Sequence, residues 1–277
     1  MLKKLGTLVG GSIISLSLLA VFATASNATS VKITITNNSA AGGLSLTPLY
    51  AAFHDSSFDP FDVGDKASEG LEQLAELGSP AAIAAIRQQI QPESTGGVIA
   101  ADAGGSPPPI QPGETASRVF DLNAVDHAFF TFLSMVLPSN DTFIGNDNAL
   151  RIFNDMGEFL GPQTINVTGL DIYDAGTEVN DPSPLGGAAP FNDAPGGVDE
   201  DGVITQGQSL AGFAGQNLFG TILSEQLIDF TSNPGTFNLA TIQISAVPLP
   251  AALPLFGAAL LGIGFLGKRR KKNAISA

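Results

Sequence analysis

Three acidic side chains lie just after apolar stretches of the chain and could share one cation. Asp141 lies in the segment Pro138–Gly145, and Asp174 and Glu178 lie in a second short loop. If the strands before these loops are neighbours in a sheet, both loops emerge at one end and the three carboxylates converge. Calcium takes about six to eight oxygen ligands, so backbone carbonyls and water would have to complete the shell. Asp in a loop is also typical of a turn or a cap, and the spacing alone leaves that alternative open.

Alternating and continuous apolar stretches predict the strands that must position these loops. In residues 31–36 apolar and polar residues alternate strictly and two asparagines follow, which is typical of a strand with one wet face that ends in a turn. Residues 129–137 are apolar on both faces in places, which indicates a central strand. Further strands are expected at residues 117–122, 149–153 (with a turn at 154–157 after it), 164–170 and 236–246.

Residues 67–90 carry apolar side chains at helical spacing. Ser68 is placed to cap a first helix, and Gly78 can end that helix in the left-handed conformation. Ser79 and Pro80 then predict the cap and first turn of a second helix. We expect a helical hairpin that packs on the sheet.

Two long loops without regular elements are predicted, over the Gly-, Pro- and Ala-rich residues 96–113 and the Gly-, Pro- and Asp-rich residues 181–201. Short strands between turn-rich loops favour an antiparallel β-sandwich. Residues 31–245 are therefore expected to form one mainly β domain with a helical hairpin insertion. Hydrophobic targeting helices are expected at the two ends of the chain.

Three segments of the chain resemble the spondin domain family: Gly64–Leu71 together with Leu74–Glu76, Pro138–Gly145, and Asp174–Glu178. The resemblance spans roughly residues 31–245. It implies a calcium-binding β-sandwich similar to membrane-binding calcium modules, with the metal held by acids at the positions of Asp141, Asp174 and Glu178. The animal form of the domain tends to have Asp where this chain has Glu178, and the extra methylene moves the carboxylate oxygens by roughly 1.5 Å.

Composition excludes several classes of function. Five of the 12 Lys and Arg and all 26 Asp and Glu fall within residues 26–246, which gives that stretch a formal charge of −21. Such a surface repels phosphate backbones, so we expect no nucleic-acid partner. Many carboxylates in an exported protein suggest bound calcium, although solubility alone explains the same surplus. Cysteine is absent, which excludes disulfides and cysteine-ligated zinc or iron.

The beginning of the chain has the pattern of a secretory signal peptide. Lys3 and Lys4 precede the apolar residues 5–22, and Ala23–Ala25 has the small-x-small form that signal peptidase accepts. Residues 1–25 are therefore predicted to be a signal peptide.

The end of the chain has three consecutive parts. Val247–Ala251 reads Val-Pro-Leu-Pro-Ala, residues 252–266 are uncharged and mostly apolar, and residues 268–272 are all Lys or Arg. The apolar part is short against the roughly 20 residues of a spanning helix, and the basic cluster would stay on the cytoplasmic side. Residues 247–277 resemble the PEP-CTERM sorting signal in its VPLPA form, which implies processing by a membrane-embedded exosortase. A plain C-terminal membrane anchor is the alternative.

Other chemical motifs are weaker. Residues 197–208 imitate an EF-hand loop, but Gly and Gln stand at its first and twelfth positions, where ligands are required. Ser209 lacks the final glycine of a nucleophile elbow. His54 and His127 are the only histidines, and a structural role is expected for His127.

We expect an exported, non-enzymatic protein that binds calcium and acts in cell-surface or exopolysaccharide-matrix adhesion. Its partners would be an exosortase-type processing enzyme and exopolysaccharide or surface proteins, and it would meet the membrane only through its C-terminal segment before processing. It would be secreted or held on the surface of a Gram-negative bacterium, with transient inner-membrane anchoring. The alternative is a secreted carbohydrate-active enzyme with two carboxylates roughly 5–9.5 Å apart.

Overall fold

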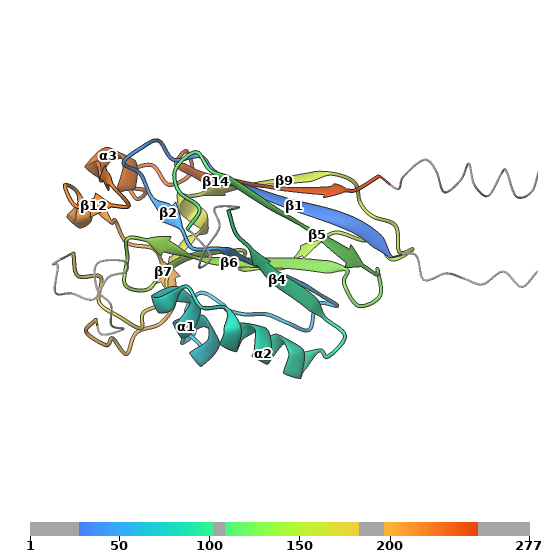
Figure 1. Ribbon diagram of the computed structural model, residues 1–277. Helices are drawn as coiled ribbons and strands as arrows, with labels where there is room; N and C mark the ends of the chain where they lie inside the picture. The colour runs from blue at the N-terminus through green and yellow to red at the C-terminus, as the bar shows by residue number, and fades with distance from the viewer. Residues whose placement is uncertain (1–27, 102–108, 183–196, 249–277) are drawn as a thin grey trace, which may run out of the picture.

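A computed structural model describes residues 28–101, 109–182 and 197–248, which form a mainly β structure with two large antiparallel sheets (Figure 1). The first sheet has four strands in the order β5-β1-β14-β9. Their bounds are β1 (Thr29–Asn37), β5 (Thr115–Leu122), β9 (Gln163–Thr168) and β14 (Asn238–Ala246). The first and last of the described strands, β1 and β14, thus pair in the middle of this sheet.

The second sheet follows the order β11-β10-β7-β6-β3-β4, and two short strands also pair with β6. The bounds are β2 (Ser45–Leu46), β3 (Leu49–His54), β4 (Thr95–Ile99), β6 (Phe129–Leu137), β7 (Thr142–Gly145), β8 (Leu150–Arg151), β10 (Ile172–Asp174) and β11 (Thr205–Gln206). Strand β6 is central and almost wholly buried, as its continuous apolar run predicts.

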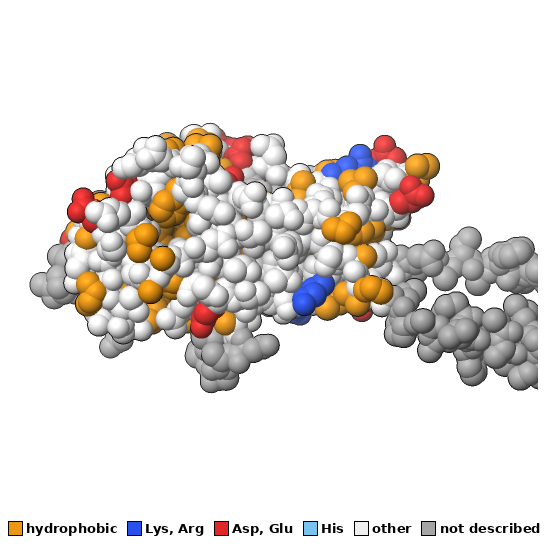
Figure 2. Space-filling view, turned by 90° about the horizontal axis from the view of Figure 1, so that it is seen from above, with side chains coloured by type: hydrophobic (Ala, Val, Ile, Leu, Met, Phe, Trp, Pro, Cys, Tyr) orange, Lys and Arg blue, Asp and Glu red, His pale blue; other side chains and the backbone are white. Residues whose placement is uncertain are grey.

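The main core joins the two sheets. Alternate residues of β1, including Ile33 and Ile35, point inward and meet Phe130 and Phe132 of β6 and Ile242 of β14 in one buried cluster. The predicted β-sandwich layering is therefore confirmed. In the four-stranded sheet, none of the outward side chains of β1, β9 and β14 is acidic, and charged side chains are sparse on this face (Figure 2).

Two helices, α1 (Glu69–Leu77) and α2 (Ala81–Ile90), cover the other face of the second sheet (Figure 1). Leu71 and Leu74 of α1 pack with Leu133 and Phe143 of the sheet in a second buried cluster. Ser68 accepts a hydrogen bond from the Leu71 N–H at the start of α1. Gly78 ends the helix at φ 64°. The predicted helical hairpin and its first cap are confirmed.

The remaining short elements close one end of the sandwich. They are the 3-10 helices η1 (Gly169–Asp171) and η2 (Ala211–Phe213), the hairpin β12 (Asn217–Leu218) and β13 (Thr221–Ile222), and the helix α3 (Glu225–Ile228). In Figure 1 this end lies opposite the end where β1 begins and β14 finishes.

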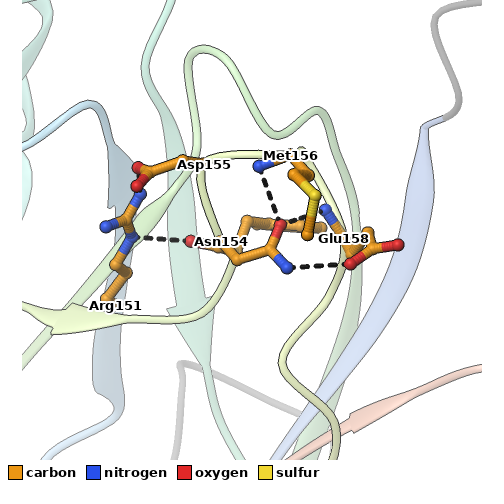
Figure 3. A network of polar contacts seen from close by, with 6 residues as sticks. Arg151, Asn154, Asp155, Met156 and Glu158 are labelled. Carbon is orange, nitrogen blue, oxygen red and sulfur yellow. Dashed lines mark hydrogen bonds and ion pairs between the residues drawn. The ribbon is translucent and has the colours of Figure 1, made fainter.

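The predicted turn at residues 154–157 is built by one asparagine (Figure 3). The Asn154 side-chain oxygen accepts hydrogen bonds from the Met156 and Glu158 N–H groups at 3.0 and 2.9 Å. Its amide donates to the Glu158 carboxylate at 2.9 Å. Arg151 forms an ion pair with Asp155 on the other side of the turn. These local bonds explain why a polar sequence bends the chain here.

Three sequence predictions are wrong in detail. Residues 95–99, most of which were expected to lie in a loop, form β4, because Gly96 and Gly97 pair closely with β3 at the sheet edge. Pro80, rather than Ser79, is the residue before α2, and no side chain caps that helix. The strand expected to reach Leu170 ends at Thr168, whose hydroxyl accepts a hydrogen bond from the Leu170 N–H and starts η1.

The two ends of the described domain leave it side by side, because Val31 pairs with Ala246 across β1 and β14. The predicted signal peptide, residues 1–25, and nearly all of the predicted sorting signal, residues 247–277, lie outside the described residues. Among the residues that are described, no helix is both long and apolar enough to cross a membrane.

Candidate functional site

The two predicted loops meet at one end of the second sheet. Asp141 directly precedes β7, Asp174 ends β10, and these strands run antiparallel with Thr142 opposite Asp174. The start of β7 and the end of β10 therefore lie at the same edge. The strand before the Asp141 loop, β6, is separated from β10 by β7, so the two expected strands are not direct neighbours. The expected meeting of the loops nevertheless occurs, and the Ala175 N–H donates to the Asp141 carbonyl oxygen at 3.2 Å.

Asp141 is at the centre of this arrangement and is completely buried. Its Oδ2 accepts hydrogen bonds from the backbone N–H groups of Thr177 and Glu178 at 2.9 and 3.2 Å. These donors come from the second loop, so the Asp141 carboxylate ties the two loops together. Backbone N–H groups stabilise a carboxylate in its charged form.

Asp174 is held by its own loop and by an asparagine. Its Oδ1 accepts a hydrogen bond from the Gly176 N–H at 3.0 Å. The Asn180 amide donates to Asp174 Oδ2 at 3.2 Å and lies 3.5 Å from Asp141 Oδ1, so one side chain bridges two acids. The tight turn expected at Gly176 is confirmed, because this glycine has φ 68° and a Cβ there would lie 2.6 Å from the Val203 carbonyl oxygen.

Glu178 is buried in the same region, but its carboxylate faces other partners. Its Oε2 accepts a hydrogen bond from the Asn140 amide at 3.3 Å, and its Oε1 accepts one from the Gly197 N–H at 3.1 Å. A Cβ on Gly197 would lie 2.4 Å from Glu178 Oε2, so this approach requires glycine. Glu178 also forms an isolated β-bridge with Asp199. Residues 197–202, the start of the EF-like stretch, thus form a third segment of the site.

The electrostatics of the site favour protonation of its acids. Burial, with the nearby Asp174 charge, raises the pKa of Asp141 to about 7 against the opposing effect of its backbone donors. Burial also raises the pKa of Asp174, and the Glu200 charge adds to this. On α1, burial raises the pKa of Glu76 to about 7, with a contribution from Glu178. Sequence reasoning missed Glu76, since nothing in a helical pattern indicates which exposed-looking acid will face a distant loop.

Within the described ranges, no Lys or Arg forms an ion pair with Asp141, Asp174 or Glu178, and the nearby Lys66 pairs with Asp201 at the exposed rim of the site. The ion pairs found there are Lys66 with Asp201 and Arg151 with Asp155. A groove of about 430 Å³ lined by Thr177, Asp199 and Glu200, among others, adjoins the site. The carboxylate and amide oxygens present are of the kind that calcium prefers.

The arrangement of these oxygens is not that of a formed metal cage. Among the described residues, no group of three or more His, Asp or Glu side chains is placed so that it could hold a metal ion. Asp141 and Asp174 share the Asn180 amide, whereas the Glu178 carboxylate faces Asn140 and Gly197. The donor chemistry therefore fits calcium, and binding would require the carboxylates to exchange N–H donors for the ion.

The weaker catalytic motifs have structural partners. His54 is buried, with Nε2 2.9 Å from the Thr131 hydroxyl, and its Nδ1 accepts from the Ser56 backbone N–H rather than from a hydroxyl. His127 bonds through its ring to the Asn123 N–H and the Glu93 carbonyl oxygen. The Ser209 hydroxyl donates to Asp229 at 2.8 Å.

Comparison with known proteins identifies one family. The family model described as Spondin_N matches residues 40–182, which include α1, both predicted site loops and every strand of the second sheet except β11. No curated protein matches the chain at a significant level. The match covers half of the sequence and contains all three segments that carry the resemblance. The chain therefore belongs to the Spondin_N family.

Proposed function

We propose that this protein is an exported, non-enzymatic member of the Spondin_N family that binds calcium at Asp141, Asp174 and Glu178 and acts in cell-surface or matrix adhesion. Membership of a family that is generally extracellular supports the location outside the cell. One observation carries the calcium proposal. Asp141 is fully buried beside Asp174, with its pKa raised to about 7 and no ion pair to a described Lys or Arg.

A bound cation would offset the cost of this burial. Buried carboxylates are normally paired with a cation or coordinate a metal, because removing a charge from water is costly. Calcium accepts irregular sets of oxygen ligands, whereas magnesium demands a near-octahedral cage. The mixed supply of carboxylate, amide and backbone oxygens at the joined loops therefore favours calcium.

A thermal melt with added cations tests the proposal. We expect the melting temperature to rise with millimolar calcium and to rise less with magnesium, because only the ion that fits the site binds the folded state preferentially. Sodium chloride at matched ionic strength is the control for screening of the acidic surface. Equal shifts with all three salts would refute a specific calcium site. Hydrolysis of a polysaccharide by the calcium-loaded protein would instead favour the alternative of a carbohydrate-active enzyme.

We further propose that export uses residues 1–25 as a signal peptide and that residues 247–277 direct processing by an exosortase-type enzyme in a Gram-negative bacterium. The support is the order of the Val247–Ala251 motif, the apolar residues 252–266 and the basic cluster. In a host with an exosortase, mass spectrometry of the surface form should show a chain that ends near Pro250. An intact tail through Ala277 on that form would contradict the proposal.

A further inference from the structure

One of the five basic residues in the domain is buried away from the acidic loops. Arg87 on α2 is 4% exposed, although it lies in a surface helix. Its Nε donates to the Tyr50 hydroxyl at 2.9 Å, and its Nη1 donates to the Ser94 hydroxyl at 2.5 Å. Both partners are buried, so the guanidinium group is fixed in place. An arginine has five N–H donors, and among the described residues these two bonds involve Nε and Nη1 but not Nη2.

This guanidinium group has no carboxylate partner in the described parts of the chain. The ion pairs there belong to Lys66 and Arg151. Buried charges in proteins are usually paired, because an uncompensated charge in a low-dielectric site is costly. Both observed partners of Arg87 are neutral hydroxyl groups. The positive charge is therefore available to an anion from outside the chain.

A hollow of about 430 Å³ lies against Arg87, between α2 and the edge strand β4. Its volume is within the range of about 300–1,000 Å³ that is typical of small-molecule sites. Tyr50 and Gln88 add polar groups to the lining. Gly96 forms part of the opposite wall, where a Cβ would lie 2.6 Å from the Ala51 carbonyl oxygen and 3.5 Å from Arg87 Nε. A Cβ at position 96 would therefore clash with the backbone of β3 and touch the guanidinium group at ordinary contact distance.

We propose that this hollow binds the carboxylate group of a small organic acid. The free N–H groups of Arg87 at Nη1 and Nη2 form a fork that matches the two oxygens of a carboxylate. The Tyr50 hydroxyl accepts its hydrogen bond from Arg87 Nε, so its own hydrogen can be donated to the ligand. Burial raises the pKa of Tyr50, which keeps that hydrogen in place at neutral pH.

The single positive charge of Arg87 favours a ligand with one negative charge. One guanidinium group neutralises one negative charge, and a dianion such as sulfate would leave an excess negative charge in a domain of formal charge −21. The carboxylate can belong to a simple organic acid or to an acidic sugar. Acetate and D-glucuronate represent these two sources, and D-glucose is the uncharged counterpart of the second.

The test uses the full-length chain in neutral detergent micelles and in buffer freed of calcium by a chelating resin, so its outcome is independent of the proposed calcium site. Ligand-observed NMR would measure binding of acetate, D-glucuronate, D-glucose and sulfate. Gln88→Glu keeps the size of a lining side chain and adds a negative charge at the hollow. Gln89→Glu adds the same charge at the next exposed position of α2, which does not line the hollow. Arg87→Gln removes the guanidinium group itself.

We expect both carboxylates to bind and glucose and sulfate to bind at least about tenfold more weakly. Gln88→Glu should weaken carboxylate binding about three- to tenfold, and Gln89→Glu should leave it within about twofold. Arg87→Gln should abolish binding; if that variant does not fold, the Gln88 and Gln89 pair decides the result.

Tighter binding of glucuronate than of acetate would assign the site to acidic sugars, and equal binding would assign it to the carboxylate alone. Failure of both carboxylates to bind, binding of glucose or sulfate as tight as theirs, or equal effects of the two glutamates would overturn the proposal.

Discussion

Asp141→Asn should abolish the calcium-dependent rise in melting temperature. Asp141 connects the two site loops and is their most deeply buried acid, so its loss removes both a ligand and the charge that attracts the ion. At a calcium concentration one hundredfold above Kd, ligand binding stabilises the wild type by about 2.7 kcal/mol. For a domain of this size that corresponds to a rise of roughly 5–10 °C. Differential scanning fluorimetry with and without calcium would measure the loss.

The matched control is Glu93→Gln, which removes one carboxylate charge at an exposed position between α2 and β4. This variant should keep the full calcium response. A wild-type response in Asp141→Asn would show that the calcium ligands lie elsewhere. Loss of the response in both variants would show that calcium acts through the net charge of the domain.

The same residue should make the calcium-free protein less stable as the pH rises. The pKa of Asp141 is about 7 in the folded chain and 3.8 as a model value. The folded state therefore holds this proton more tightly, and the resulting stability is complete below about pH 4 and is lost as the pH rises through 7. At about 1.4 kcal/mol per pKa unit, the loss is on the order of 4 kcal/mol. Urea denaturation at several pH values should show that Asp141→Asn lacks this loss.

The second large effect has the opposite sign and arises from His54. Burial lowers the pKa of this imidazole from 6.5 to about 4. The folded chain thus disfavours the charged form, so the stability that His54 contributes is present above pH 6.5 and is lost as the pH falls through 4. The loss is about 3 kcal/mol. NMR titration of the His54 ring should give a midpoint near pH 4.

His54→Asn separates this effect from that of the acidic site. The difference in unfolding free energy between the wild type and this variant should shrink by about 3 kcal/mol between pH 7 and pH 4. Because both proteins keep the acidic site, its contribution cancels in the difference. A midpoint near 6.5 together with a constant difference would show that the His54 ring is accessible to protons in the folded state.

Local patterns in the sequence predicted the elements whose signals are local. The alternation in residues 31–36 predicted the central part of β1, and Ser68 and Gly78 predicted the ends of α1. Strand β4 was missed because Gly96 and Gly97 carry no side chains that could show alternation. A Cβ at position 96 would clash with β3, and a Cβ at position 97 would clash with the Arg118 side chain. Both neighbours are distant in sequence, so no local pattern indicates that glycine is needed here.

The site was predicted as far as its loops and no further. The sequence predicted that the loops of Asp141 and Asp174 meet if the strands before them are neighbours; the loops do meet, but through the pairing of β7 with β10. The bridging amide of Asn180 and the approach of Gly197 to Glu178 depend on how three segments pack. An asparagine in a turn-rich segment gives no sign of the acids that it will contact. Neither the sequence nor the family match shows how close Asn180 lies to Asp141 and Asp174.

The pairing of β1 with β14 makes the domain respond differently to force in different directions. The backbone hydrogen bonds that join β14 to β1 and β9 run perpendicular to the strands. If Ala246 is pulled along β14 while the far end of the sandwich is held, these hydrogen bonds are therefore loaded in shear. All of those bonds then share the load. A pull that separates Val31 from Ala246 instead opens the β1 ladder one pair at a time from its end. A domain held by its C-terminal strand alone is therefore loaded in its mechanically stronger direction.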